Sequence, residues 1–438
     1  MPSPRVLTLM GSGETAPTMV STHRRLAARL EPSPGRVRTN VRAAVLDTPY
    51  GFQENASELA ERAVAYFSES IDVDLDVAGL TRIIGVDDLT VERGLEVLRR
   101  SDYIFAGPGS PTYAVEQWRG SAVPGALRSK LEQGGVVVFA SAAALTLGVA
   151  TVPVYEIYKC GHEPFWADGL DLLAGIGIEA AVIPHYDNAE GGHHDTRFCY
   201  LGERRLTHME TMLPEGTWVL GIDEHTGLVI DLDAGQAEVT GNGGVTLRVD
   251  GESLHHPTGS ILDLAILTDR DAVSRTIRGD ASTVRATEIA DDHASDLATI
   301  PASAEQTVES SLADTADRAD REFSAAITAG DAATATGVML ELETAIWAWS
   351  ADTLQSDETD RARQVLRSMV TRLGEAAVAG LADPRAVVAP LVNLLLQLRS
   401  DARAEKRFEV SDLIRDRLDE TGVEVRDTAD GAEWDLRA

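Results

Sequence analysis

The sequence predicts an α/β domain built on a mostly parallel sheet with helices on both faces, followed by a separate, mainly helical domain. Three observations carry this prediction. Strand and helix signals alternate through the first part of the chain, as they do where helices cover a parallel sheet. The run 136–140 is continuously apolar and rich in valine, which is typical of a parallel strand buried on both faces. Beyond about residue 318 the apolar spacing is helical.

The elements of the first domain follow from apolar periodicity and from the glycine turns between segments. In chain order they are 5–10 (strand), 16–30 (helix), 43–46 (strand), 54–67 (helix), 103–106 (strand), 113–131 (helix, with a break near Pro124) and 136–140 (strand). Another apolar strand ends at His185. After it come shorter β segments divided by glycine turns, at 218–223, 227–231 and 245–249, which predict an antiparallel extension of the same sheet.

The 438 residues are too many for one core, and composition suggests where they divide. We expect an α/β domain at 1–268, a polar linker rich in Ala, Asp, Ser and Thr at 269–317, and a helical domain at 318–438. Helical periodicity covers 322–349, 359–378, 388–398 and 408–418. Two short β segments around Asp430-Gly431, at 423–426 and 433–436, predict a closing hairpin.

Composition and charge exclude several classes of function. No apolar run approaches the roughly 18–20 residues that span a bilayer, and the N-terminus lacks a signal-peptide pattern, so we expect a cytoplasmic protein without a membrane partner. The net charge of −31 repels phosphate backbones, which makes nucleic acid an unlikely partner. The two cysteines, Cys160 and Cys199, are expected to be free thiols.

Ser141 is the candidate nucleophile. It stands between the buried strand 136–140 and an Ala/Leu-rich helix, a turn that projects a hydroxyl above the carboxyl edge of a sheet and directs backbone N–H groups at a developing oxyanion. Phe139 and Ala143 occupy the places where such turns usually have glycine, and a simple helix N-cap is the alternative interpretation.

Other segments supply candidate partners for this serine. The Gly-rich loop 107–109 opens a helix, and the N–H groups of Gly109 and Ala142 are candidate oxyanion donors. His185 follows an apolar strand at the edge where open α/β sheets place their sites, so it is the candidate general base. For the third member we expect a carboxylate between these two residues: Glu156, with Glu163 and Asp168 as rivals.

The segment from Tyr186 to Arg197 is dense in polar residues and glycine and is expected to line the mouth of the site. Tyr186, Asn188 and Arg197 are the candidate substrate-binding residues, with Arg197 suited to holding a carboxylate by two hydrogen bonds. A divalent metal could instead bind His185, Asp187, His193, His194 and Asp195, but their spacing fits no standard signature, so we expect neither a metal nor a cofactor.

On these residues, the first 265 or so positions resemble the serine peptidase family of dipeptidase E and cyanophycinase. The matching segments, in order, are 9–14, 106–109, 140–142, 184–186, 197–205 and 220–226. The resemblance implies a flavodoxin-like, class I glutamine-amidotransferase-like fold. It also implies that Ser141 attacks an amide carbonyl, that His185 takes its proton, and that the acid follows the serine shortly, as Glu156 does.

The C-terminal part resembles the C-terminal end of cysteinyl-tRNA synthetase, through 403–418, 422–428 and 431–434. The catalytic signatures of a synthetase are absent from the sequence, so it is not expected to charge tRNA. From residue 398 to the end there are 8 Arg and Lys against 12 Asp and Glu, which opposes phosphate contact and favours a role in packing or homo-oligomer formation.

The sequence therefore predicts a serine-dependent peptidase or amidohydrolase acting on a small peptide or amide through a Ser-His-Glu triad. A binding or regulatory protein that kept the fold and lost the chemistry is the first alternative. An accessory protein of tRNA or cysteine metabolism without synthetase activity is the second.

Overall fold

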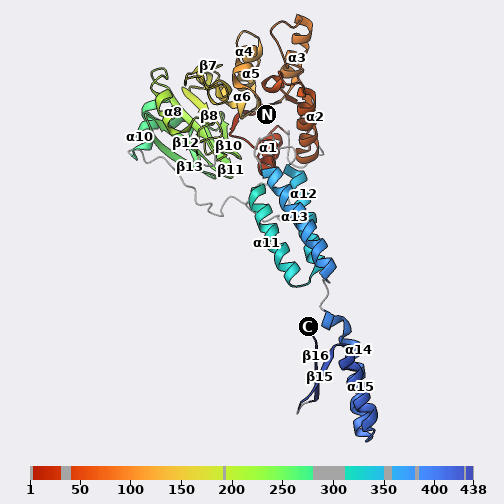
Figure 1. The fold of residues 1–438 in the computed structure, drawn as a ribbon. Coiled ribbons are helices and arrows are strands. Elements are labelled where there is room, and N and C mark those ends of the chain that lie inside the picture. Colours follow the sequence, from red (N-terminus) through yellow and green to blue (C-terminus); the bar gives the residue numbers. More distant parts are fainter. Residues whose placement is uncertain are drawn as a thin grey trace, which may run out of the picture. The chain divides into compact units, whose positions relative to one another are not determined.

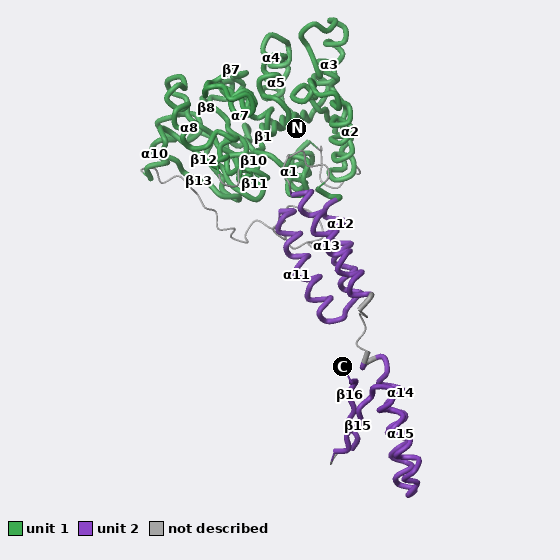
Figure 2. Tube along the Cα trace, in the orientation of Figure 1, with its two compact units in different colours: residues 1–309, 347–356 green, residues 310–346, 357–438 purple. Residues whose placement is uncertain are grey.

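The computed structural model describes residues 3–30, 41–190, 194–279, 311–349, 358–379, 384–428 and 431–437. Within them the chain forms two compact units, residues 1–309 with 347–356 and residues 310–346 with 357–438 (Figure 2). The division after residue 309 falls inside the stretch predicted as a linker. The domain limits given above otherwise stay a prediction.

The first unit is an α/β structure with two main sheets in its described residues (Figure 1). The larger has eight strands in the order β14-β11-β10-β1-β5-β4-β2-β3, and the smaller has four in the order β13-β12-β9-β8. The strands of the larger sheet are β1 (Arg5–Met10), β2 (Ala43–Val45), β3 (Leu75–Val77), β4 (Tyr103–Ala106), β5 (Gly135–Ala140), β10 (Thr226–Asp231), β11 (Gln236–Gly241) and β14 (Ile261–Asp263).

The smaller sheet contains β8 (Ala180–Ile183), β9 (Trp218–Ile222), β12 (Gly244–Val249) and β13 (Glu252–Pro257). A two-stranded pair joins β6 (Ala150–Thr151) to β7 (Ala167–Asp168). The helices of this unit are α1 (Val20–Ala28), α2 (Ala56–Tyr66), α3 (Asp88–Arg100), α4 (Pro111–Arg119), α5 (Val123–Gln133), α6 (Ala142–Leu145), α7 (Val154–Tyr158), α8 (Gly202–Glu210), α9 (Leu264–Leu267) and α10 (Arg270–Ile277).

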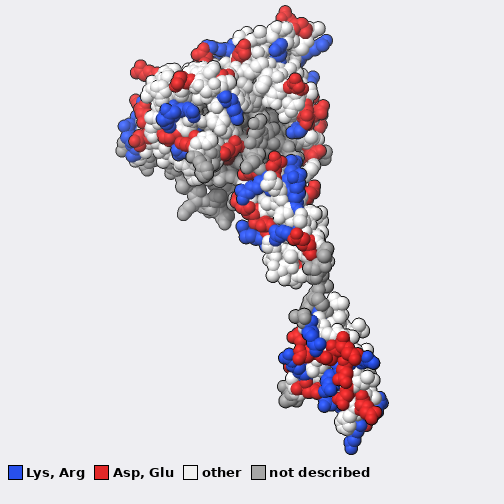
Figure 3. Space-filling view, in the orientation of Figure 1, with Lys and Arg blue, Asp and Glu red and all other residues white. Residues whose placement is uncertain are grey.

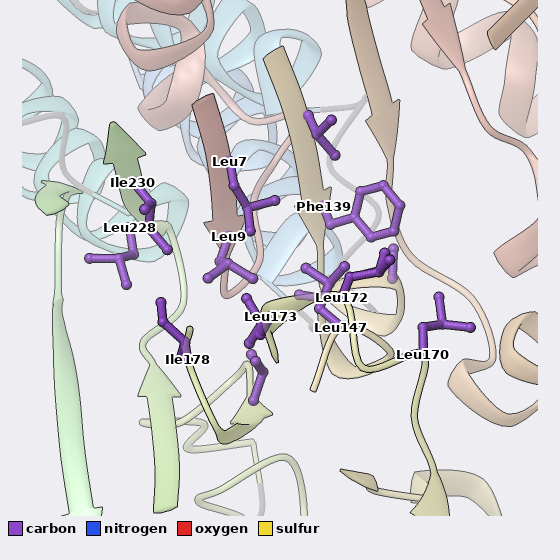
Figure 4. Close-up of a cluster of buried hydrophobic side chains, with 14 of the residues drawn as sticks. Leu7, Leu9, Phe139, Leu147, Leu170, Leu172, Leu173, Ile178, Leu228 and Ile230 are labelled. Carbon is purple, nitrogen blue, oxygen red and sulfur yellow. The ribbon is translucent and has the colours of Figure 1, made fainter. Parts of the chain in front are cut away.

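Side chains along the central strands alternate between two buried layers, which explains the helices on both faces. On β1, Leu7 and Leu9 enter one hydrophobic cluster, and Val6 and Met10 enter the other. The first cluster also takes in the inner faces of α3, α4 and α5, whereas the second takes in α1 and α2. Figure 4 shows the first cluster, where β1, β5 and β10 contribute side chains to one core. The flavodoxin-like, mostly parallel architecture is therefore confirmed.

The structure corrects the expectation for the strands beyond His185. They do not simply extend one sheet, because β9 pairs parallel with β8 in the smaller sheet while β10 pairs antiparallel with β1 in the larger one. Neither β3 nor α3 is among the elements predicted from the sequence. The segment 113–131 divides into α4 and α5 as expected, with Pro124 in the first turn of the second helix.

Part of the predicted linker is folded. Residues 270–277 form α10, which packs beside β12 and fully buries Val273, so this stretch belongs to the α/β unit despite its polar composition. The last residues of the predicted linker begin α11 (Leu312–Thr328), and residues 280–310 lie outside the described part of the chain.

The second unit contains α11, most of α12 (Ala332–Ala348), α13 (Glu358–Ala379), α14 (Pro384–Ala404) and α15 (Phe408–Glu420), and it ends in the hairpin β15 (Val423–Thr428) and β16 (Gly431–Leu436). The predicted hairpin is confirmed. The helical stretch 322–349 is broken at Gly330, whose φ of +69° ends α11.

A small core joins α14 and α15 to the hairpin. Val392, Leu418, Val423 and Trp434 are buried together, and Trp434 Nε1 donates to Asn393 Oδ1 at 3.0 Å. No helix among the described residues has the length and apolar character needed to cross a membrane.

Candidate active site

Ser141 lies on a strained turn between β5 and α6. Its φ of 50° and ψ of −121° fall in a region that residues with a side chain rarely adopt. Its backbone N–H donates to Met10 O at 3.0 Å, so the strand pairing of β5 with β1 continues up to the serine before the chain turns. The geometry matches the strained strand-to-helix turn of a nucleophile elbow rather than a simple N-cap, because no side-chain cap bond is made there.

The missing glycines on either side of Ser141 do not prevent this turn. The Phe139 ring lies in the buried cluster of Figure 4. Its centroid is 5.8 Å from that of the Trp118 ring. Ala143 is fully buried, and its N–H donates to Gly107 O at 3.2 Å. Both side chains thus have room within packed structure, so neither position needs to be glycine for the chain to turn.

His185 lies directly beyond β8, and its imidazole faces Ser141. Nε2 is 2.9 Å from Ser141 Oγ, although the two residues come from different sheets. The backbone at His185 has a φ of 49°, and its carbonyl accepts from Cys199 N at 3.1 Å. The side chain is only 10% exposed, so contacts with the protein fix the position of the imidazole.

The carboxylate on the other imidazole nitrogen belongs to Glu224. Glu224 Oε1 is 2.9 Å from His185 Nδ1 and also accepts from Asn188 Nδ2 at 3.0 Å. The Glu224 N–H donates to Asp187 Oδ1 at 2.7 Å, which fixes the turn on which the carboxylate stands. Glu224 lies between β9 and β10, where the chain passes from one sheet to the other beside the end of β1.

This arrangement corrects the expectation for Glu156. Its Oε1 accepts from Thr112 Oγ1 at 2.7 Å, and the contact with His185 Nδ1 is made by Glu224 instead. The two alternative carboxylates do not contact His185 either, since Glu163 is exposed and Asp168 pairs with Arg119 at the surface. The signal for Glu224 was present in the sequence: the triplet Asp223-Glu224-His225 directly follows a buried strand, as His185 does.

Charge around the imidazole favours its protonated form. Burial opposes protonation of His185, but the hydrogen bond and charge of Glu224, together with the charges of Glu14 and Glu190, outweigh it and raise the His185 pKa above its ordinary 6.5. Burial likewise opposes ionisation of Glu224, and the His185 contact overcomes it, so the pKa of Glu224 is lowered. Both shifts stabilise an imidazolium–carboxylate pair.

The N–H groups of Gly109 and Ala142 are the two candidate oxyanion donors. Neither the Gly109 nor the Ala142 N–H has a hydrogen-bond acceptor among the residues that the structure describes. Gly109 has a φ of +140°, and a Cβ there would lie 2.0 Å from Pro49 O. Glycine at this position therefore permits the loop to lie close to the backbone of Pro49.

The three predicted substrate-binding residues have other partners. The Tyr186 ring is buried and packs 4.5 Å from the ring of Phe198. Asn188 is buried and orients Glu224. Arg197 remains exposed, but its guanidinium already makes two 2.9 Å hydrogen bonds to the Asp195 carboxylate. Asn188 therefore contacts the Glu224 carboxylate, Tyr186 packs against Phe198, and the two-pronged contact expected of Arg197 is made to Asp195 of the same chain.

The alternative metal site gains no support from the described residues. Among them, no group of three or more His, Cys, Asp or Glu side chains is arranged to hold a metal ion. Asp195 is held by Arg197, and Asp187 by the Glu224 N–H. His193, one of the five candidates, lies outside the described residues.

A serine hydroxyl, an imidazole and a carboxylate thus form one hydrogen-bonded series beyond the carboxyl ends of β5, β8 and β9, which belong to two sheets. This is the arrangement of serine-dependent hydrolases, recognised by geometry and independent of the order of the residues in the chain. Here the order is Ser141, His185, Glu224.

Comparison with known proteins adds to the picture of the C-terminal part. The family model of the cysteinyl-tRNA ligase anticodon binding domain matches residues 387–434, which confirms the resemblance noted in the sequence. A cysteine–tRNA ligase of Chlorobium luteolum is 38% identical over 90 residues, which make up 19% of this chain and 19% of the ligase. The chain therefore spans about a fifth of the length of that relative.

Two solved structures are similar to part of this chain. One is a peptidase from an acI-B1 actinobacterium, 17% identical with a TM-score of 0.47, covering 59% of this chain and 97% of the other. The second is a putative peptidase E protein from Listeria monocytogenes EGD-e, 12% identical with a TM-score of 0.37, covering 55% of this chain and 99% of the other.

Proposed function

We propose that the α/β unit is a serine-dependent peptidase or amidohydrolase. The observation that carries this proposal is the continuous series Ser141 Oγ, His185 Nε2, His185 Nδ1 and Glu224 Oε1, with both hydrogen bonds at 2.9 Å. The strained backbone at Ser141 supports it, since strain of this kind persists where a function requires it.

The chemistry follows from these positions. Ser141 Oγ attacks the carbonyl carbon of an amide while His185 Nε2 takes the hydroxyl proton, and Glu224 stabilises the imidazolium that forms. The N–H groups of Gly109 and Ala142 are the proposed donors to the oxyanion. Collapse of the tetrahedral intermediate breaks the C–N bond, and His185 returns the proton to the leaving amine. Water, activated by the same imidazole, then releases the acyl group and restores the serine.

We propose a small peptide or amide as the substrate, with no cofactor. This follows the family resemblance and the amide chemistry of the site. The first alternative, a binding or regulatory protein without catalysis, differs in one measurable respect. It needs no reactive serine, whereas the hydrolase requires that Ser141 be more nucleophilic than an ordinary surface serine.

A fluorophosphonate probe tests this difference directly. We expect the intact protein to be labelled at Ser141 near neutral pH, and labelling to disappear in Ser141→Ala. Ser57→Ala, an exposed serine in the first turn of α2, is the matched control and should label as the intact protein does. Absence of labelling of the folded protein at every pH tested would favour the binding alternative.

A second candidate function is contact with RNA through the C-terminal unit, and the match to an anticodon-binding family model favours it. Charge opposes it. On the face shown in Figure 3, acidic and basic side chains are interspersed over α14, α15 and the hairpin, and the sequence beyond residue 398 carries more acidic than basic groups. Filter binding of tRNA at low salt decides the matter, because retention that falls steeply with added salt is expected only of phosphate contact.

A further inference from the structure

The Gly-rich loop 107–109, which is proposed to supply an oxyanion donor, is fixed at both of its ends. At one end, Gly107 O accepts from Ala143 N at 3.2 Å, which ties the loop to the turn that carries Ser141. At the other, Ser110 N donates to Pro49 O at 2.8 Å. Ser110 also begins α4 as its N-cap, since its Oγ accepts from Tyr113 N at 3.2 Å.

A series of hydrogen bonds leads from this N-cap to Glu156. Ser110 Oγ lies 3.0 Å from Thr112 Oγ1, and Thr112 Oγ1 donates to Glu156 Oε1 at 2.7 Å. A hydroxyl has a single proton. Because Thr112 gives its proton to Glu156, the proton between the two hydroxyls must come from Ser110. The direction is therefore set along the whole series: Tyr113 N–H to Ser110, Ser110 to Thr112, Thr112 to Glu156.

We propose that Glu156 is a positioning residue for the oxyanion site: through Thr112 and Ser110 it holds the Gly109 N–H in the place where it meets the developing oxyanion. This inference rests on the proposed function. Glu156 stands on α7, which follows the nucleophile turn in the chain, so the series joins that segment to the loop after β4. It thereby ties the N-cap of α4, which directly follows Gly109, to a helix that comes after the segment carrying Ser141 and Ala142.

The surroundings of Glu156 suit this task. The side chain is half-buried, and its second oxygen, Oε2, is buried without a hydrogen-bond partner among the described residues. The hydrogen bond from Thr112 is therefore the side-chain contact through which the Glu156 carboxylate can orient the loop. Hydrogen bonds to an ionised acceptor are the stronger kind, and hydroxyls in series reinforce one another.

Removing the acceptor should affect the transition state more than substrate binding. Loss of a whole oxyanion donor costs about 10²–10³ in kcat, and displacing one that remains present should cost less, roughly 5- to 50-fold. We expect Glu156→Ala to lower kcat by this factor with KM within about twofold. Glu156→Gln keeps an acceptor oxygen and should stay within about threefold of the intact protein. Thr112→Val, which breaks the series, should match Glu156→Ala, and Thr112→Ser should restore activity.

A reversible inhibitor that forms a tetrahedral adduct with Ser141, such as a peptide boronic acid, provides an independent measure. Its affinity should fall in Glu156→Ala by the same factor as kcat/KM, while the affinity for a product amine stays unchanged. Glu163→Ala, an exposed carboxylate seven positions further on, is the matched control and should change none of these quantities.

Amide hydrogen exchange of the segment 107–114 tests the inference without turnover. In Glu156→Ala the Ser110 and Tyr113 amides should exchange at least about fivefold faster, and in Glu156→Gln at the original rate. If exchange responds as expected but Ser141 is never labelled, Glu156 does fix the loop, and the proposed hydrolase function is refuted. If Ser141 labels and exchange is unchanged in Glu156→Ala, the positioning role is refuted. Equal impairment of the Ala and Gln variants would refute it as well, since it would show that the carboxylate's charge acts directly.

Discussion

Replacing Glu224 by glutamine is the most decisive perturbation of the proposed site, because it removes charge and keeps shape. Glu224 Oε1 receives hydrogen bonds from His185 Nδ1 and Asn188 Nδ2. The amide oxygen of glutamine can accept both, so the imidazole keeps its orientation and its tautomer. What is lost is the negative charge that stabilises the imidazolium as the serine attacks.

The expected magnitude follows from the geometry. With a 2.9 Å hydrogen bond, the centres of charge of the imidazolium and the carboxylate lie about 4 Å apart. Two unit charges at that separation interact by about 4 kcal/mol at an effective dielectric constant of about 20. Since about 1.4 kcal/mol is tenfold in rate, Glu224→Gln should lower kcat/KM roughly 10³-fold. Glu156→Gln, by contrast, should change it by no more than about threefold.

The assay is the second-order rate of fluorophosphonate labelling, measured across pH. His185 acts as a base only when neutral, so the rate should rise with pH through an apparent pKa above the ordinary 6.5. In Glu224→Gln, the burial that lowers the His185 pKa remains. The negative charge of Glu224, which raises that pKa, is lost. The rising limb should therefore move to lower pH. A variant that labels within about threefold of the intact protein, with an unmoved limb, would refute the assignment of Glu224.

Three further predictions concern stability. In urea titrations, the free energy of unfolding of Ser141→Gly should exceed that of Ser141→Ala by about 1 kcal/mol, because glycine accepts a φ of 50° without strain. Gly109→Ala should cost more than about 2 kcal/mol in the same measurement and abolish labelling, because its Cβ would lie 2.0 Å from Pro49 O. Asp427→Asn should cost about 2 kcal/mol, since it leaves the guanidinium of Arg399, 3% exposed, without its charged partner. Folding lowers the Asp427 pKa through its hydrogen bonds to Arg399, so this contribution is present above the ordinary 3.8 and is lost as pH falls through the lowered value, which acid titration of unfolding would show.

The sequence predicts the architecture well because local patterns determine it. The alternation of apolar side chains on β1 and β5 reflects burial on both faces, and each glycine turn reports a change of direction. The break between α4 and α5 follows from Pro124, which cannot lie in the middle of a helix but fits its first turn. The polar stretch that becomes α10 shows the limit of such reasoning. Val273 and Thr276 are buried there and Ile277 packs against the core, and composition averaged over the segment does not reveal this.

The candidate site is predicted only in part, and the direction of one strand explains why. The sequence shows that β9 is a strand but does not show which neighbour it pairs with. An antiparallel strand would end at the edge opposite His185, and then Glu224 could not reach the imidazole. Because β9 runs parallel to β8, the residues that follow both strands meet at one edge. His185 and Glu224 are 39 positions apart in the chain yet share a 2.9 Å hydrogen bond.

The same reasoning explains why Glu156, expected from the sequence to contact His185, bonds to Thr112 instead. Its position shortly after Ser141 brings it near the site, but proximity along the chain does not decide which side of the imidazole a carboxylate reaches. Nδ1 of His185 faces the turn between β9 and β10, because Nε2 is engaged by Ser141 and the ring's two nitrogens point in different directions. The carboxylate of Glu156 on α7 instead accepts from Thr112, in the first turn of α4. Sequence order therefore identified the chemical types at the site, and only the pairing of strands assigns each carboxylate to its partner.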